Sequence, residues 1–364
     1  MTHAPGRDPQ PPAKPSARRP PAPRRGHFQR SGNRPLARLV TLAVFAAVAL
    51  PPAAPAQGVR PMARADFEAL LARVSNAGRW GAQDERGTLN LVTPEVRLAA
   101  AAEVRTGRTV SLAREMVHGV PEGGFGPITV EMMLVPDSVL GPSDGSVAWA
   151  AERTSLLYHG WSYTHIDALT HLAYRGRGYN NAPSAHAPPA GQARNAVGAM
   201  RDGLVTRGVL VDLPALKGVP YVAPGGGITA ADFEAWEERT GVRVRPGDVL
   251  LVRSGRWSEA ALAANVARSA GIHPSAAAWL HARGVAALGD EAGTDTSPSA
   301  VAGITSPLHV LALVGMGMPL IENLDLERLA REAAAQNRWT FLLVIAPLNV
   351  RGATGSAANP IAIF

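Results

Sequence analysis

Short apolar segments limit most strongly what this chain can fold into. Each is only a few residues long and is bounded by Gly, Pro, Asp or Asn, a pattern typical of β-strands. Several are apolar at successive positions, which favours burial on both faces of a sheet. The six predicted strands are Ile128–Val135, Ser155–His159, Gly208–Leu213, Val249–Ser254, Val285–Leu288 and Phe341–Leu348.

Helical patterns accompany these strands. Ala63–Ala77 has apolar residues at helical spacing, Thr93 begins a second helix, and a capping box from Thr229 to Asp232 begins a third that ends at Gly241. Helices between and after strands predict a mixed α/β domain, with a mixed β-sheet core and helices flanking it. We find no internal repeat and no long polar linker, so we expect residues 63–364 to form one domain.

The positive charge of the chain lies in its first 56 residues. A formal net charge of +7 and a pI near 10.4 would ordinarily indicate a nucleic acid or an anionic membrane as partner. Residues 1–56 hold nine of the 36 Lys and Arg residues and one of the 29 acidic residues, which leaves 27 basic and 28 acidic residues for the rest. We therefore expect no nucleic-acid partner.

The same 56 residues resemble an export signal. An Arg- and Pro-rich start precedes the apolar run Leu39–Leu50, and Ala54-Pro55-Ala56 is typical of a cleavage site. The apolar run is short for a membrane span. We expect an exported, periplasmic or secreted protein whose mature form is not inserted in a membrane; the alternative is an uncleaved anchor. The chain has no cysteine, so any metal must be held by His, Asp and Glu.

The segment from Thr164 to His171 concentrates two imidazoles and a carboxylate. His165 and Asp167 are two positions apart and share one face of a strand, whereas Asp167 and His171 are four apart and share one face of a helix. Such ligands suit zinc, manganese or ferrous iron. A buried carboxylate without a cation or donors is costly, which favours a metal or catalytic site. The alternative is a set of hydrogen-bonded residues at an element boundary, with Asp167 as a cap.

Two further polar residues lie within apolar runs near the C-terminus. They are His309, which follows Ser306-Pro307-Leu308, and Glu322, thirteen residues later. Each alone is typical of a cap or of a hydrogen-bonded core residue. Beside an incomplete metal site, however, they have the chemistry of its missing ligands.

Several short motifs follow one another in a recognisable order. They are Trp80-Gly81, Gly87-Thr88-Leu89-Asn90, Thr164–His171, Tyr179-Asn180-Asn181, Leu308-His309, Ile321-Glu322-Asn323-Leu324 and Ala346-Pro347-Leu348. Together they resemble the cyclase family of metal-dependent hydrolases, which includes kynurenine formamidase and isatin hydrolase. The resemblance covers residues 78–364. It implies a swivelling β/β/α-type fold, a homo-oligomer, and a divalent metal, zinc or manganese.

The resemblance also implies roles for individual residues. His165 and Asp167 would be metal ligands, and Asp167 would be able to bridge two ions. His309 and Glu322 would bind a second ion. His171 would be the acid/base histidine rather than a ligand.

One position departs from the family pattern. Short members have another metal-binding histidine four residues before the one that matches His165, and Trp161 stands there in this chain. His159 is the nearest substitute, but a straight strand would hold it about 20 Å from His165. Gly160 would permit the chain to bend. His159 is therefore either a ligand or a histidine of the surrounding core.

These residues and the resemblance predict hydrolysis of a small cyclic or aryl amide, a formamide or a lactone, with metal-activated water and a histidine acid/base. The chain has no cysteine nucleophile and no Gly-x-Ser-x-Gly motif. Trp80, Trp161 and Tyr163 are candidates for a substrate pocket, or are ordinary core aromatics. Two alternatives stay open: an exported protein that binds a small ligand through the metal without turnover, and a purely structural metal cluster.

Overall fold

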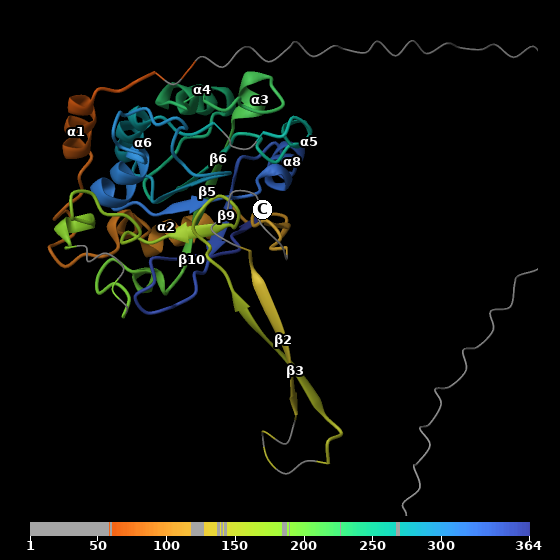
Figure 1. Ribbon diagram of the computed structural model, residues 1–364. Helices are drawn as coiled ribbons and strands as arrows, with labels where there is room; N and C mark the ends of the chain where they lie inside the picture. Colours follow the sequence, from red (N-terminus) through yellow and green to blue (C-terminus); the bar gives the residue numbers. More distant parts are fainter. Residues whose placement is uncertain are drawn as a thin grey trace, which may run out of the picture. The chain divides into compact units, whose positions relative to one another are not determined.

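A nine-stranded sheet of mixed direction forms the centre of the fold (Figure 1). Its strand order is β1-β11-β9-β5-β6-β7-β8-β4-β10, in which β5 to β8 run parallel and the other neighbours antiparallel. Its strands are β1 (Thr109–Ser111), β4 (His165–Asp167), β5 (Leu204–Asp212), β6 (Val249–Arg253), β7 (Ala287–Asp290), β8 (Leu320–Glu322), β9 (Thr340–Ile345), β10 (Gly355–Ala357) and β11 (Ile361–Ile363). This computed structural model describes Gly58 and residues 60–364 except 118–126, 137, 138, 140, 142, 143, 184–187, 189, 226 and 267–269.

Both faces of this sheet are buried. Along β5, Val209 and Val211 belong to one apolar cluster and Leu210 to another, and β6 alternates in the same way. The first cluster takes in helices α1, α4 and α6, whereas the second takes in α8. A layer on each side explains why successive residues of these strands are apolar. The predicted α/β class, with a mixed sheet and flanking helices, is confirmed.

The predicted helix signals lie at observed helix ends. The Thr93 side chain accepts a hydrogen bond from the Val96 N–H, and Thr229 forms the capping box that begins α4, which Gly241 ends in the left-handed region. The α-helices are α1 (Arg64–Arg73), α2 (Pro94–Ala101), α3 (Leu213–Lys217), α4 (Ala230–Thr240), α5 (Glu259–Ala263), α6 (Ala277–Arg283), α7 (Pro307–His309) and α8 (Glu327–Gln336). Shorter turns are the 3₁₀ helices η1 (Gly87–Leu91), η3 (Tyr179–Asn181), η4 (Val197–Met200) and η5 (Pro274–Ala276), and the π-helix η6 (Val310–Met316), which continues α7.

Five of the six predicted strands overlap observed ones, and the prediction of a strand at Ser155–His159 is wrong. The strand there is β3 (Ala148–Ser155), which ends where the predicted one begins. Among the described residues β3 pairs with β2 (Thr129–Pro136) alone, as a two-stranded sheet separate from the large one. The apolar residues that follow Ser155 lie outside any strand, and Leu157 among them is 63% exposed, so this short apolar run is not a buried strand.

Two expectations concern membranes and export. Among the residues that the structure describes, none of the helices combines the length and apolar content needed to span a bilayer. The basic leader, residues 1–56, lies outside the described residues, so the export signal stays a prediction.

After β3 the chain makes a sharp bend at Gly160. This glycine has a φ of +112°, a conformation that L side chains rarely adopt. The bend turns His159 back towards β4, and its imidazole reaches Asp167 despite the distance that a straight strand would impose. Glycine is thus required here by geometry.

We expect Gly160→Ala to reduce the free energy of unfolding by about 1–3 kcal/mol, because a Cβ is disfavoured at this φ. Metal affinity should also fall, since His159 would be displaced. Urea unfolding and a metal titration measure the two effects. Gly198→Ala is the control, because Gly198 lacks a positive φ and an added Cβ would have its nearest neighbour 3.9 Å away. Equal behaviour of both variants would contradict this account.

Candidate metal centre

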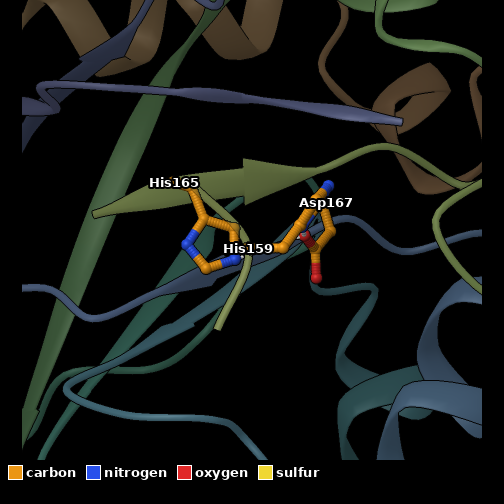
Figure 2. A group of neighbouring side chains, drawn as sticks. All are labelled: His159, His165 and Asp167. Carbon is orange, nitrogen blue, oxygen red and sulfur yellow. Dashed lines mark ion pairs between the residues drawn. The ribbon is translucent and has the colours of Figure 1, made fainter. Parts of the chain in front are cut away.

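The edge of the large sheet gathers the predicted ligands. His165 on β4 lies directly opposite Glu322 on β8, and Asp167 ends β4. Figure 2 shows the side chains of His159, His165 and Asp167 converging. Two groups have ligand atoms within 4.8 Å of one another, and they share Asp167: His159, His165 and Asp167 form one, and Asp167, His309 and Glu322 the other.

The Asp167 carboxylate is the centre of this cluster. The side chain is fully buried, and neither oxygen has a hydrogen-bond partner among the described residues. Oδ1 lies 2.9 Å from His159 Nδ1 and 3.4 Å from His165 Nε2, whereas Oδ2 lies 3.8 Å from His309 Nε2. Since these contacts lack hydrogen-bond geometry, the imidazoles surround the carboxylate without satisfying it.

A backbone hydrogen bond fixes which nitrogen of His165 faces the cluster. Its Nδ1 lies 2.8 Å from the carbonyl oxygen of Tyr163, and a carbonyl can only accept. Nδ1 therefore carries a proton, and Nε2 is the ring nitrogen that faces Asp167 and Glu322. A histidine that binds a metal through Nε2 has its Nδ1–H held by a carbonyl or carboxylate in the same way.

His309 is held by a carboxylate that the sequence analysis did not identify. Its Nδ1 lies 2.6 Å from Asp295 Oδ2, and the same carboxylate accepts the backbone N–H groups of Leu308 and His309 at the start of α7. His309 Nε2 points the other way, 3.2 Å from Glu322 Oε1. Thr294 donates its N–H and its hydroxyl to that same oxygen. Asp295 and Thr294 thus position both members of the second group.

Burial and charge shift the pKa values in opposite directions. Burial alone would raise the pKa of the Asp167 carboxyl, but the surrounding imidazoles hold it well below its usual range. Burial is also outweighed at Glu322, whose pKa His309 lowers. Burial would lower the pKa of His309, but Glu322 and Asp295 raise it well above its usual value. The carboxylates of Asp167 and Glu322 are therefore ionised, and their negative charge suits a cation.

His171 stands beside the cluster rather than within either group. Its ring stacks on that of His159 with centroids 3.9 Å apart, and its Nε2 lies 4.0 Å from Asp167 Oδ2. Burial lowers its pKa and outweighs the attraction of Asp167. Its side chain is still 28% exposed, so a neutral imidazole meets solvent next to the candidate ligands.

The residues present fit a divalent cation. A buried, ionised carboxylate without hydrogen bonds is costly, and a cation between the imidazoles would satisfy it. Three His nitrogens and two carboxylates are donors that zinc and manganese both accept. His159, His165 and Asp167 would hold one ion, and the second group, through the shared Asp167, could hold another.

The predicted aromatic residues lie in different surroundings. Tyr163 is buried, and its hydroxyl accepts the N–H of Ile128 at the base of β2. Trp161 is 38% exposed and lies against Gly293. Trp80 is partly buried under the guanidinium of Arg79. A substrate-binding role for these three stays a prediction.

Removing the support of His309 should weaken metal binding. We expect Asp295→Asn to lower metal affinity about 10- to 100-fold, because the carboxylate orients the ring and strengthens it as a ligand. Metal titration followed by calorimetry measures the change. Asp202→Asn, at an exposed carboxylate, is the control and should leave affinity unchanged. An unaltered affinity in Asp295→Asn would show that His309 does not bind the ion.

Comparisons with known proteins point in one direction. The family model described as "Putative cyclase" matches residues 109–296, slightly more than half of the chain. The crystal structure of a novel cyclase is 29% identical with a TM-score of 0.72, and the match covers 81% of this chain and 99% of that one. Comparison with curated proteins finds no match.

Two isatin hydrolases are more distant. Isatin hydrolase A from Ralstonia solanacearum is 23% identical with a TM-score of 0.49, over 74% of this chain and 97% of that one. Isatin hydrolase A from Labrenzia aggregata, bound to benzyl benzoate, is 20% identical with a TM-score of 0.48, over 72% and 94%.

Proposed function

The chain belongs to the cyclase family, and on that premise we propose that it is a metal-dependent hydrolase of a small cyclic or aryl amide, a formamide or a lactone. The observation that carries the proposal is the Asp167 carboxylate, buried among imidazoles and without a hydrogen bond from the described residues. An arrangement of this kind destabilises a protein unless a cation completes it. A purely structural hydrogen-bond network would have satisfied both oxygens.

Each group in the proposed reaction has a part. A divalent ion, when bound, acts as a Lewis acid that lowers the pKa of water and polarises a carbonyl. His171, neutral and at the edge of the cluster, takes the proton from the attacking water. The imidazolium then gives that proton to the leaving nitrogen or oxygen. The negative Asp167 beside His171 stabilises the charged ring between the two transfers.

The function is tested by metal analysis of the purified protein together with a hydrolysis screen. The panel holds N-formyl aromatic amides, isatin-like lactams and lactones, and we expect turnover of one class that chelation abolishes and zinc or manganese restores. A protein that binds metal and ligand stoichiometrically but hydrolyses no member would be the non-catalytic binding protein. Unfolding on chelation would identify a structural cluster.

A further inference from the structure

The imidazole of His159 joins the metal centre from outside the large sheet. His159 lies between the end of β3 and the bend at Gly160, and its ring is beside the Asp167 carboxylate (Figure 2). Nδ1 lies 2.9 Å from Asp167 Oδ1, and this nitrogen is buried without a hydrogen-bond partner among the described residues. A buried nitrogen and a buried carboxylate that face each other unbonded have the arrangement of two ligands of one ion.

The other ring nitrogen of His159 is held by a hydroxyl. Nε2 lies 3.0 Å from Thr354 Oγ1, and Thr354 stands directly before β10. A hydroxyl can donate or accept, so it suits either tautomer of the ring. When an ion occupies Nδ1, the proton is on Nε2, and the Thr354 oxygen accepts it. The contact is therefore the one that ligation through Nδ1 requires.

Gly355, the first residue of β10, leaves room for this ring. A Cβ added at Gly355 would lie 2.9 Å from His159 Cε1 and 2.5 Å from the carbonyl oxygen of Ile166. Both distances are too short for a real side chain, so the ring packs directly against the backbone of β10. Gly355 also lies opposite Asp167 in the register of β10 and β4. One glycine thus admits the imidazole and pairs with the strand that carries the carboxylate.

The backbone at the start of β10 binds the segments on both sides of the site. The Thr354 carbonyl accepts the N–H of Ala168, which follows Asp167. The Gly355 carbonyl accepts the hydroxyl of Tyr158, which precedes His159. These bonds fix the position of Thr354 and Gly355 relative to the two candidate ligands. The His159 ring then has little freedom to turn away from Asp167.

A histidine with only a core role would not need this arrangement. In a purely structural role both ring nitrogens would be hydrogen-bonded, yet only Nε2 of His159 is, and Nδ1 is buried without a bond from the described residues. Trp161 stands where short family members have their histidine, so the support for His159 comes from another part of the chain. Thr354 is 195 positions away in the sequence.

We propose that Thr354 and Gly355 are positioning residues of the metal centre, which hold His159 so that it binds the ion through Nδ1. The inference rests on the proposed function, because it requires a bound metal. It adds the ligating atom of His159 and the residues that aim it. His171 stacks on the same ring with centroids 3.9 Å apart, so Thr354 and Gly355 also help to place the acid/base histidine.

The first test is Thr354→Val, which keeps a branched side chain and removes the hydroxyl. We expect its affinity for zinc and manganese, measured by calorimetry, to fall about 10-fold or more. Thr354→Ser retains a hydroxyl and should bind nearly as wild type does. Thr340→Val is the matched control, because it removes a hydroxyl bonded to Glu103 on β9, and its affinity should be unchanged. Far-UV circular dichroism checks that each variant is folded. Wild-type affinity in Thr354→Val would overturn the role of the hydroxyl.

The second test concerns Gly355. Gly355→Ala should also weaken zinc binding, because the added Cβ displaces the ring of His159. Gly198→Ala, whose Cβ would have its nearest neighbour 3.9 Å away, is the control and should bind as wild type does. Equal affinities of the two alanine variants would reject Gly355 as a positioning residue.

The third test identifies the ligating nitrogen. In nuclear magnetic resonance spectra of the zinc-loaded full chain labelled with ¹⁵N-histidine, the His159 signals are those lost in His159→Gln. We expect a proton on Nε2 and zinc on Nδ1. Zinc on Nε2, or on neither nitrogen, would overturn the proposal. A wild-type chain that binds neither zinc nor manganese would overturn the proposed function as well, whereas wild-type binding that the Thr354 and Gly355 variants retain would overturn this inference alone.

Discussion

Replacing Asp167 with asparagine is expected to remove metal binding and hydrolysis together. The carboxylate belongs to both candidate ligand groups and lies between three imidazoles, so no neighbouring side chain can substitute for it. An amide keeps the shape but loses the charge that makes the site attractive to a cation. Loss of about 4 kcal/mol of transition-state stabilisation would lower kcat/KM about a thousandfold.

A thermal measurement makes this prediction independent of the substrate. At a metal concentration a hundred times Kd, wild type should gain about 2.7 kcal/mol of unfolding free energy, and Asp167→Asn should gain none. Asp248→Asn is the matched control, because Asp248 is also buried but is paired with Arg207 through two hydrogen bonds. That variant should be less stable than wild type yet respond fully to metal. An Asp167 variant stabilised by metal as wild type is would refute the assignment.

The parts of the fold that local chemistry determines could be predicted from the sequence. The capping box at Thr229 acts within four residues, and Gly241 ends the same helix through its own φ, so neither depends on the rest of the chain. The apolar runs of β5 and β6 reflect burial on both faces and were equally predictable. Strands of three residues such as β4 and β8 are too short to show a period, and they are defined by their neighbours.

The candidate ligands could likewise be predicted from the sequence, whereas the carboxylate that positions one of them could not. His165, Asp167, His309 and Glu322 could be identified because polar residues in apolar runs demand an explanation. Asp295 stands in a polar Thr-Asp-Thr stretch and carried no such signal, since its contact with His309 arises only when α7 packs against it.

For His159 the sequence indicated that the chain could bend but not in which direction. Gly160 permits several turns of the chain, and the positive φ that brings the imidazole to Asp167 is set by the surrounding structure. Trp161 stands at the family's histidine position, and the imidazole of His159, two residues earlier in the chain, reaches Asp167 and is a candidate to replace that histidine.

Replacing His171 with alanine should separate catalysis from metal binding. The ring is outside both ligand groups, so metal content and the stabilisation by metal should stay at wild-type levels. Turnover should fall about 10²- to 10⁴-fold, the usual contribution of a general acid/base. Atomic emission and a stopped assay on the substrate identified by the screen measure the two quantities. His281→Ala, at a histidine bonded to Asn76, should change neither.

Two outcomes would each change the assignment of His171. If His171→Ala loses metal as well as turnover, the residue is a ligand, and its lowered pKa reflects readiness to bind a cation rather than to move a proton. If turnover survives, the acid/base is another group. His159 is then the first candidate, because its ring stacks on His171 at 3.9 Å and lies 22% exposed beside the same carboxylate. His159→Ala separates these cases, since loss of a ligand lowers metal content whereas loss of a base does not.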